Sequence, residues 1–243
     1  MDKVVAIILA AGKGTRMKSK DRNKVTLSIK GEPMIVRTVK LLQNCGIGSI
    51  VVVVGFAKES VMKVLGNTVL YAEQKKRLGT GHAVKMGLEK VNSQFSDVLV
   101  ANGDDSFLYT PSVLEELYNV HVANNCKISF LSMDIKNPTG LGRVVRNENN
   151  SVTGIVEEKD ASEEQKKIHE VNLGCYMFER QFLNKYIKQI KKSPVTGEYY
   201  IVSLIEMAVK NGFNIEAHKL APFIDWRGVN TKEDLAAAEE LAL

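Results

Sequence analysis

The chain has 243 residues, of which 44% are hydrophobic and 25% charged, and its formal net charge is +5. This apolar content excludes a disordered or collagen-like chain, and the length suits one large domain or two small ones. Lys and Arg are interleaved with Glu and Asp, and no apolar stretch approaches the ~20 residues of a membrane span, so we expect neither a nucleic-acid partner nor a membrane contact. Cys45, Cys126 and Cys175 lie far apart and form no CxxC pair. That pattern favours a reducing compartment, and we expect a cytoplasmic protein.

The first half of the chain alternates between strand and helix patterns. Continuous β-branched and apolar runs predict buried strands at 4–9, 50–54, 69–72, 97–101 and 128–133. Apolar residues at helical spacing predict helices at 33–45, 59–65, 81–91 and 111–124. The alternation predicts a three-layer α/β fold in which helices cover both faces of a mostly parallel sheet.

The second half has a different pattern. A hairpin is predicted from 143–146 and 152–157, a surface helix or lid from 159–168, strands from 171–178 and 214–218, and helices from 179–191, 198–210 and 231–241. The last helix starts with Thr231-Lys-Glu-Asp234, the spacing of an N-terminal capping box with Asp in place of Glu. No linker or repeat interrupts the chain, so we predict one α/β domain over 1–243 whose second half elaborates the sheet.

A loop of small residues follows the first predicted strand. Its sequence is Leu9-Ala-Ala-Gly12-Lys-Gly14-Thr15-Arg16-Met17. Ligands of open parallel sheets bind beyond the carboxyl ends of the strands, and small residues there let backbone N–H groups approach phosphate. Arg16 and the later Lys24 add positive charge. Met17 occupies the third Gly position of GxGxxG, which argues against a dinucleotide-binding oxidoreductase. Taken alone, the loop fits a tight turn without a ligand equally well.

A second polar sequence, Asn102-Gly103-Asp104-Asp105, follows another predicted strand. A carboxylate beside a Gly that admits phosphate is well placed to hold Mg²⁺, and Asp104 is the first choice of ligand. Three roles stay open for Asp105: a second metal ligand, an acceptor in the outer shell of the metal, or a turn residue. Without a ligand, two adjacent Asp residues after a strand are explained by turn chemistry or a helix cap.

Both loops resemble those of the sugar-phosphate nucleotidylyltransferases, and above all the uridylyltransferase domain of the bacterial N-acetylglucosamine-1-phosphate uridyltransferases. Six further motifs follow in the family's order: Leu78-Gly-Thr80-Gly-His82-Ala83, Pro138-Thr-Gly140-Leu-Gly142-Arg143, Ile155-Val-Glu157-Glu-Lys159-Asp160, Glu170-Val-Asn172-Leu-Gly174, Gly197-Glu198-Tyr199-Tyr200 and Gly228-Val229-Asn230-Thr231. The resemblance spans residues 9 to 231. It implies a Rossmann-like, mixed and mostly parallel sheet of the nucleotide-diphospho-sugar transferase type. The nucleotide-binding half is expected at 1–135 and the sugar-binding half at 136–243, with no left-handed β-helix domain.

The resemblance implies Mg²⁺-dependent transfer of a uridylyl group from UTP to N-acetylglucosamine 1-phosphate, giving UDP-N-acetylglucosamine and pyrophosphate. Only these small molecules are expected as partners, and the oligomeric state stays open. Arg16, Lys24 and Asp104 are the expected catalytic residues, and Asp104 and Asn230 the metal ligands. The expected nucleotide-binding residues are Leu9, Ala10, Ala11, Gly12, Gly14, Thr15, Gln74, Arg77, Gly79 and Thr80. The expected sugar-binding residues are Asn102, Gly142, Glu157, Asn172 and Tyr200.

The chain departs from the family at four places, which keeps alternatives open. Arg77 stands where the family has a Gln that recognises uracil, and an Arg cannot accept the uracil N3–H, so dTTP is the second choice after UTP. Arg22-Asn23-Lys24 replaces Leu-Pro-Lys, and the missing Pro predicts a looser loop. Asn102 replaces a Tyr, and Ile201-Val202-Ser203 replaces Ile-Thr-Asp. Another sugar 1-phosphate, such as glucose 1-phosphate, therefore remains an alternative, and a non-catalytic nucleotide-binding protein a less favoured one.

Overall fold

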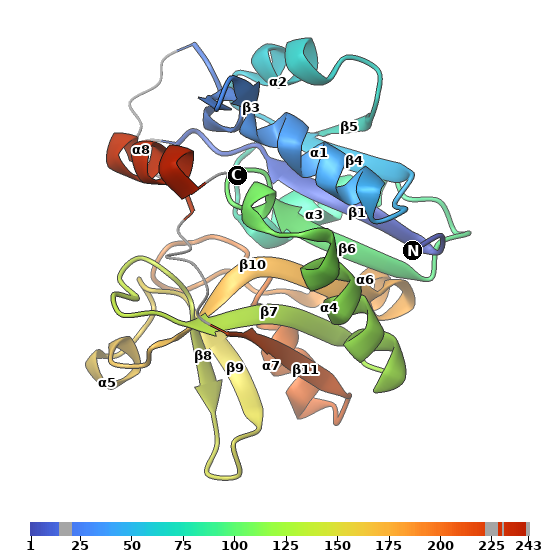
Figure 1. Ribbon diagram of the computed structural model, residues 1–243. Coiled ribbons are helices and arrows are strands. Elements are labelled where there is room, and N and C mark those ends of the chain that lie inside the picture. Colours follow the sequence, from blue (N-terminus) through green and yellow to red (C-terminus); the bar gives the residue numbers. More distant parts are fainter. Residues whose placement is uncertain (15–20, 222–227, 230, 242–243) are drawn as a thin grey trace.

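The computed structural model describes residues 1–14, 21–221, 228–229 and 231–241 (Figure 1). Its strands are β1 (Val4–Ala10), β2 (Ser28–Ile29), β3 (Glu32–Pro33), β4 (Ser49–Val54), β5 (Leu70–Glu73), β6 (Asp97–Asn102), β7 (Ile128–Asp134), β8 (Arg143–Arg146), β9 (Val152–Val156), β10 (Glu170–Glu179) and β11 (Ile215–Leu220). Its α-helices are α1 (Met34–Asn44), α2 (Lys58–Leu65), α3 (Thr80–Leu88), α4 (Pro111–Ala123), α5 (Glu163–Lys166), α6 (Arg180–Tyr186), α7 (Ser203–Lys210) and α8 (Lys232–Leu241). Short 3₁₀ helices are η2 (Lys24–Thr26), η3 (Ser106–Leu108) and η4 (Ile187–Gln189). None of the helices in the described part of the chain is long and apolar enough to span a bilayer.

One large sheet organises the molecule, with strand order β11-β7-β10-β6-β1-β4-β5. Strand β10 runs antiparallel to both β6 and β7, and the other pairs along this path are parallel. The hairpin of β8 and β9 extends from β10. The predicted mixed and mostly parallel sheet is therefore confirmed.

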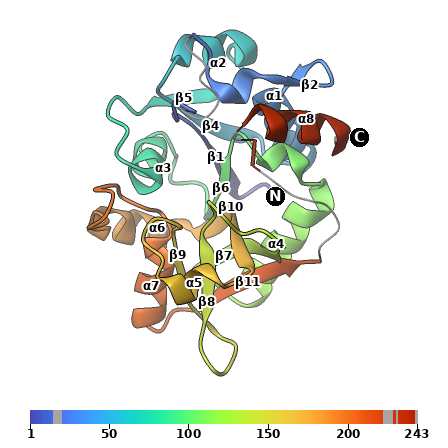
Figure 2. The same ribbon diagram turned by 90° about the vertical axis from the view of Figure 1, so that its left-hand side faces the viewer.

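The central strands read as continuous apolar runs because both of their faces are covered. Successive residues of β1 alternate between the two halves of the core: Ala6 and Ile8 pack on one face of the sheet, Val5 and Ile7 on the other. Figure 2 shows the resulting layers, with α1 and α4 on one face and α3, α6 and α7 on the opposite face. Because β1, β5 and β6 point the same way, their carboxyl ends lie at the same end of the sheet.

The helix predicted at 198–210 begins five residues later, at Ser203. The reason is a long-range pairing of backbone groups. The Tyr199 N–H donates to Leu78 O at 2.8 Å, and the Gly81 N–H donates to Tyr199 O at 2.8 Å. Gly79, with φ +102°, permits this close approach, since a Cβ there would lie 2.5 Å from Tyr199 O. Residues 198–200 therefore run beside the start of α3, and a turn in which the Ser203 N–H donates to Tyr200 O at 3.2 Å leads into α7.

Two other helical predictions need a smaller correction. The helix predicted at 179–191 is α6 followed by the 3₁₀ turn η4. The polar segment 159–168 contains only the four-residue α5, which Ser162 and Gln165 cap reciprocally. At α8 the predicted capping box is confirmed, because Thr231 N–H donates to Asp234 Oδ2 at 2.8 Å and Asp234 N–H to Thr231 Oγ1 at 3.1 Å.

Helix α8 lies against the β2–β3 segment near the other end of the chain (Figure 1). Ala238 of this helix packs with Ile29, Met34 and Val229 in a small apolar cluster. Through Val229, the cluster places the carboxyl-terminal segment beside Lys24, whose Nζ donates to Val229 O at 3.2 Å.

Candidate active site

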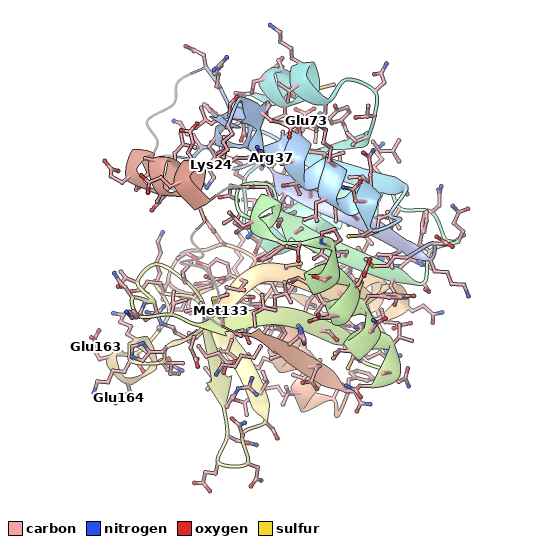
Figure 3. All side chains as sticks on the ribbon, viewed as in Figure 1. Lys24, Arg37, Glu73, Met133, Glu163 and Glu164 are labelled. Atoms are coloured by element: carbon pink, nitrogen blue, oxygen red, sulfur yellow. The ribbon has the colours of Figure 1, made fainter. Side chains whose placement is uncertain are left out.

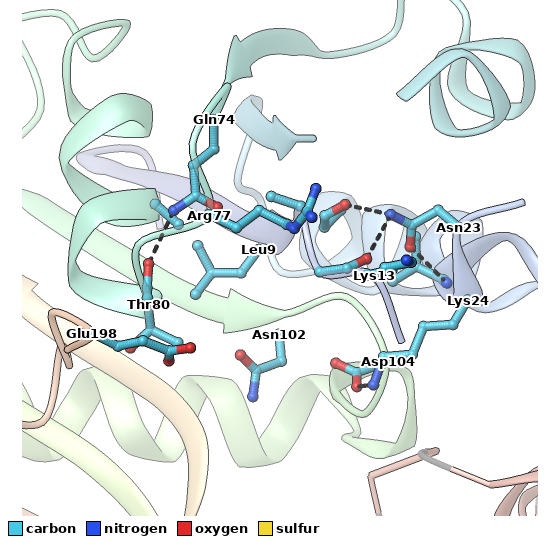
Figure 4. A pocket seen from close by; sticks show the side chains of 16 residues that line it. Leu9, Lys13, Asn23, Lys24, Gln74, Arg77, Thr80, Asn102, Asp104 and Glu198 are labelled. Atoms are coloured by element: carbon cyan, nitrogen blue, oxygen red, sulfur yellow. Dashed lines mark hydrogen bonds and ion pairs between the residues drawn. The ribbon is translucent and has the colours of Figure 1, made fainter. Parts of the chain in front are cut away.

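Two adjoining cavities open at the carboxyl ends of the parallel strands. The first has a volume of about 410 Å³ and lies between the loop after β1 and the start of α3 (Figure 4). The second, of about 210 Å³, lies between the loop before β8 and strand β10. Both cavities are bordered by Leu9, Thr80 and Asn102. The two cavities therefore adjoin, and together we call them the cleft.

Most of the residues expected from the sequence border this cleft. Those around the first cavity are Leu9, Ala10, Ala11, Gly12, Lys24, Gln74, Arg77, Gly79, Thr80, Asn102 and Asp104. Those around the second are Asn102, Gly142, Glu157 and Asn172. Gly14 borders neither cavity, and Thr15, Arg16 and Asn230 lie outside the described residues. Tyr200 borders a separate cavity of about 570 Å³ that also touches Glu157, and its hydroxyl pairs with Thr196 at 2.7 Å.

Asn23 anchors the loop that follows β1. Its side chain is 1% exposed, and Nδ2 lies 2.8 Å from Ala10 O, 2.9 Å from Phe56 O and 3.3 Å from Gly12 O. Its Oδ1 accepts the Val25 N–H at 3.2 Å and so caps η2. The segment without the family's Pro is therefore held firmly by hydrogen bonds, and the expected loosening does not occur there. The sequence carries no local signal for this anchor, because the carbonyl groups of Ala10 and Phe56 that Asn23 contacts are distant in the chain.

Lys24 and Asp104 meet across the first cavity although 80 residues separate them. The Lys24 ammonium forms an ion pair with Asp104 Oδ2, and the two side chains are 14% and 17% exposed. Lys24 Nζ also donates to Val229 O at 3.2 Å, and the Val229 N–H donates to Asp104 O at 3.2 Å. Three distant segments thus meet at Asp104, whose carboxylate pairs with Lys24 at the cavity (Figure 4).

Asp105 has a different environment from its neighbour. Its side chain is buried, and its carboxyl accepts from Asn102 Nδ2 at 3.1 Å and from Ser106 Oγ at 3.2 Å. Burial, together with the Asp104 charge, raises the pKa of Asp105 well above its usual range. Of the three alternatives, this buried position fits the outer acceptor, because the Asp105 carboxyl accepts from Asn102 and orients that side chain. Gly174 completes this packing, since a Cβ there would lie 2.1 Å from Asn102 Nδ2.

Gln74 borders the first cavity just beyond β5. Its Nε2 donates to Gly79 O at 3.0 Å and lies 3.0 Å from His82 Nδ1, which accepts in the neutral ring. Burial lowers the pKa of His82, which favours that neutral form. Both amide hydrogens of Gln74 are thereby directed inward, and no described residue donates to its Oε1. Arg77 borders the same cavity (Figure 4).

The second cavity has a carboxylate and an amide on its walls. Burial, with the charges of Asp160 and Glu198, raises the pKa of Glu157 to about 7. Asn172 donates from Nδ2 to the Tyr176 hydroxyl at 2.6 Å, and its own N–H donates to Gly142 O at 2.9 Å. The pairing of β10 with β7 shifts register between Asn172 and Tyr176. Such irregularities redirect side chains, and here Asn172 borders the cavity.

Comparisons with known proteins agree with this geometry. A family model described as nucleotidyl transferase matches residues 5–242. The chain is 42% identical over 234 residues to the bifunctional protein GlmU of Exiguobacterium sibiricum, covering 96% of this chain and 52% of that protein. It is 39% identical over 236 residues to the bifunctional protein GlmU of Limosilactobacillus fermentum, covering 97% and 51%. The chain thus spans about half the length of these curated relatives.

A solved structure shares the fold. It is a putative glucose-1-phosphate thymidylyltransferase from Bacillus anthracis in complex with a sucrose, with a TM-score of 0.79 and 24% sequence identity over 98% of this chain and 95% of that one. With the sheet, the cleft and the family match in agreement, the chain belongs to the nucleotidyl transferase family.

Proposed function

We propose that this chain transfers a uridylyl group from UTP to N-acetylglucosamine 1-phosphate, with release of pyrophosphate. The observation that carries the proposal is the continuous cleft. At one end the Lys24–Asp104 ion pair borders the same cavity as Ala10, Ala11 and Gly12, and at the other Glu157 and Asn172 border a cavity of about 210 Å³. The 42% identity to a bifunctional GlmU protein supports this choice among the nucleotidyl transferases.

The nucleobase is recognised at the first cavity. Uracil presents an N3–H that needs an acceptor, and Gln74 Oε1, to which no described residue donates, belongs to a side chain at the wall of that cavity. Cytosine offers an acceptor at the same atom and would leave Gln74 Oε1 unpaired, which penalises CTP. Thymine has the same N3–H as uracil, so dTTP remains the second choice.

The chemistry needs charge neutralisation and alignment. An oxygen of the sugar phosphate attacks the α-phosphorus in line, the bond to the bridging oxygen breaks, and pyrophosphate leaves. The attacking phosphate is already an anion, so no side chain has to take a proton. Lys24 and, by family resemblance, Arg16 stabilise the charge on the triphosphate.

Mg²⁺ fits the residues at this end of the cleft. The Asp104 carboxylate is a hard oxygen donor on the cavity wall, and Mg²⁺ commonly uses one or two protein oxygens together with phosphates and water. Asn230, which follows Val229 in the sequence, is the proposed second ligand. When bound, the ion neutralises charge shared by the α-phosphate and the sugar phosphate.

The sugar occupies the second cavity. Its hydroxyls donate to the ionised Glu157, and Asn172 and the Gly142 backbone border the same space. A buried acceptor left without a hydroxyl would disfavour a mismatched sugar. N-acetylglucosamine 1-phosphate is the first choice here, and glucose 1-phosphate the alternative.

A panel experiment tests the proposal. Pyrophosphate release is measured for four sugar 1-phosphates with UTP, dTTP, CTP and ATP, with and without Mg²⁺. We expect the highest kcat/KM for UTP with N-acetylglucosamine 1-phosphate, and no turnover after chelation. Turnover only with dTTP or only with glucose 1-phosphate would select an alternative. Tight UTP binding without any pyrophosphate release would indicate a non-catalytic nucleotide-binding protein.

A further inference from the structure

The loop at 140–142 borders the second cavity beside Glu157 and Asn172, since a Cβ at Gly142 would lie 3.6 Å from Glu157 Oε2 and 3.7 Å from Asn172 Cβ. Little packing fixes its tip. Gly140 has φ +83°, and an added Cβ there would find no atom within 4 Å. A loop of this kind keeps a single conformation only if hydrogen bonds hold its backbone. Gly142 O accepts the Asn172 N–H at 2.9 Å, which holds one end.

Arg143 holds the middle of this loop. It starts β8 and is 1% exposed, which is unusual for a charged side chain. Its Nη1 donates to Leu141 O and pairs with Glu158 Oε2 at 2.7 Å, while Nη2 donates to Lys166 O at 3.4 Å. A buried guanidinium is tolerated only when such partners replace its water.

Glu158 holds the other end of the loop. Its Oε2 accepts the Gly140 N–H at 3.1 Å as well as the Arg143 guanidinium. Burial acts to raise its pKa, but hydrogen bonds from Gly140 and Arg143, with the Arg143 charge, bring the pKa of Glu158 below its ordinary value. Glu157 directly follows β9 and borders the cavity, whereas Glu158 lies in the turn that the Asp160 N–H closes on Glu157 O at 2.9 Å and is not part of the cavity wall.

We propose that Arg143 and Glu158 are positioning residues for the sugar phosphate, because their ion pair fixes the Gly140–Gly142 loop at a set distance from Glu157. Neither side chain borders the cavity, so both act through the loop backbone. This inference rests on the proposed function, since it assigns the second cavity to the sugar. The loop does not border the first cavity, where Gln74 lies, so we expect nucleotide affinity to be independent of the pair.

The test compares Glu158→Ala, Glu158→Gln and Arg143→Lys with a matched control. Glu163→Gln is that control, because it removes one carboxylate from the exposed Glu163–Lys166 pair on α5 (Figure 3). KM for each substrate, kcat and the unfolding temperature are measured for every variant. For Glu158→Ala and Arg143→Lys we expect KM for the sugar phosphate to rise about tenfold, with KM for UTP within about twofold of the parent value. Glu158→Gln keeps the acceptor for Gly140 and should recover part of the affinity. The control should match the parent chain.

The outcomes separate this inference from the proposed function. If the parent chain turns over no sugar phosphate, the proposed function fails. If the parent is active and the variants keep its KM for the sugar phosphate, the positioning role is overturned. A parallel rise in both KM values that follows the unfolding temperature would also overturn it, because it would show a structural role alone. If Glu158→Ala does not fold, Glu158→Gln and Arg143→Lys are read by the same criteria.

Discussion

The side-chain amide of Asn23 lies 2.8 Å from the carbonyl oxygen of Ala10 and so joins the start of η2 to the carboxyl end of β1. The same nitrogen also lies within hydrogen-bonding distance of Phe56 O and Gly12 O. One buried amide thus holds the backbone at the carboxyl end of β1, where we propose that the nucleotide binds.

Asn23→Ala should therefore harm both stability and nucleotide binding. The substitution leaves buried carbonyl oxygens without donors, and we expect a loss of about 2–3 kcal/mol in the free energy of unfolding. KM for UTP should rise more than KM for the sugar phosphate. Urea unfolding and steady-state kinetics check both effects. Asn149→Ala, in the exposed β8–β9 turn, is the matched control. An Asn23→Ala chain as stable as this control would contradict the anchoring role.

Asp104→Ala should remove most turnover while the fold persists. The carboxylate lies on the cavity wall, and we expect kcat to fall by a factor of about 10²–10³ because charge at the reacting phosphates is no longer neutralised. Lys24→Met should lower kcat in the same direction. Pyrophosphate release measures the rate, and the far-UV circular dichroism spectrum checks the fold. Lys58→Ala, which breaks the half-exposed Lys58–Glu73 pair, should leave kcat unchanged. A near-normal Mg²⁺-dependent rate in Asp104→Ala would remove Asp104 from the metal site.

Sugar binding should strengthen as the pH rises through about 7, where Glu157 ionises and becomes an acceptor for hydroxyls. The free energy of unfolding should fall over the same rise in pH. Because the folded-state pKa of Glu157 is raised, the contribution of the neutral carboxyl is fully present below the unfolded value and is lost as the pH rises through about 7.

Glu157→Gln should consequently have a larger free energy of unfolding than the parent chain at pH 8, by on the order of 2–3 kcal/mol, and so a higher unfolding temperature, and it should match the parent near pH 4.5. Its KM for the sugar phosphate should rise and lose its pH dependence. Calorimetry and kinetics between pH 5 and pH 8 measure the two effects, and Glu164→Gln on the exposed face of α5 is the control. A pH-independent difference in unfolding temperature would exclude the titration of Glu157 as its cause.

Gln74→Ala and Arg77→Ala should separate recognition of the base from attraction of the triphosphate charge. Without Gln74 Oε1 the uracil N3–H has no partner, so the ratio of kcat/KM for UTP over CTP should fall about tenfold or more. Arg77→Ala should lower the rate for both nucleotides and keep the ratio, since a cation that borders the cavity attracts any triphosphate. The reverse assignment of the two effects would place base selection on Arg77.

The sheet and the order of its elements were predictable because β1, β4 and β6 are buried on both faces and their apolar runs are continuous. The late start of α7 was not predictable. Tyr199 exchanges hydrogen bonds with a loop about 120 residues earlier, and local periodicity carries no record of that pairing.

The candidate site was predictable in outline for a similar reason. Residues such as Lys24 and Asp104 follow strand ends, where ligands of parallel sheets bind. The roles of Asn23, Asp105 and Glu158 depend on which backbone atom or amide each one meets in space. Neighbouring residues in the sequence do not specify those partners, so only the assembled fold identified them.

The antiparallel strand β10 also constrains how this chain can fold during synthesis. In the described structure β7 is hydrogen-bonded only to β10 and β11, although all the strands on the far side of β10 precede both in the sequence. When residues 128–134 leave the ribosome, neither partner of that strand has yet been made. Strand β7 therefore stays unpaired until β10, which ends at Glu179, has emerged. Pairing between strands that are distant in the sequence slows folding, and an unpaired apolar strand exposes the intermediate to aggregation.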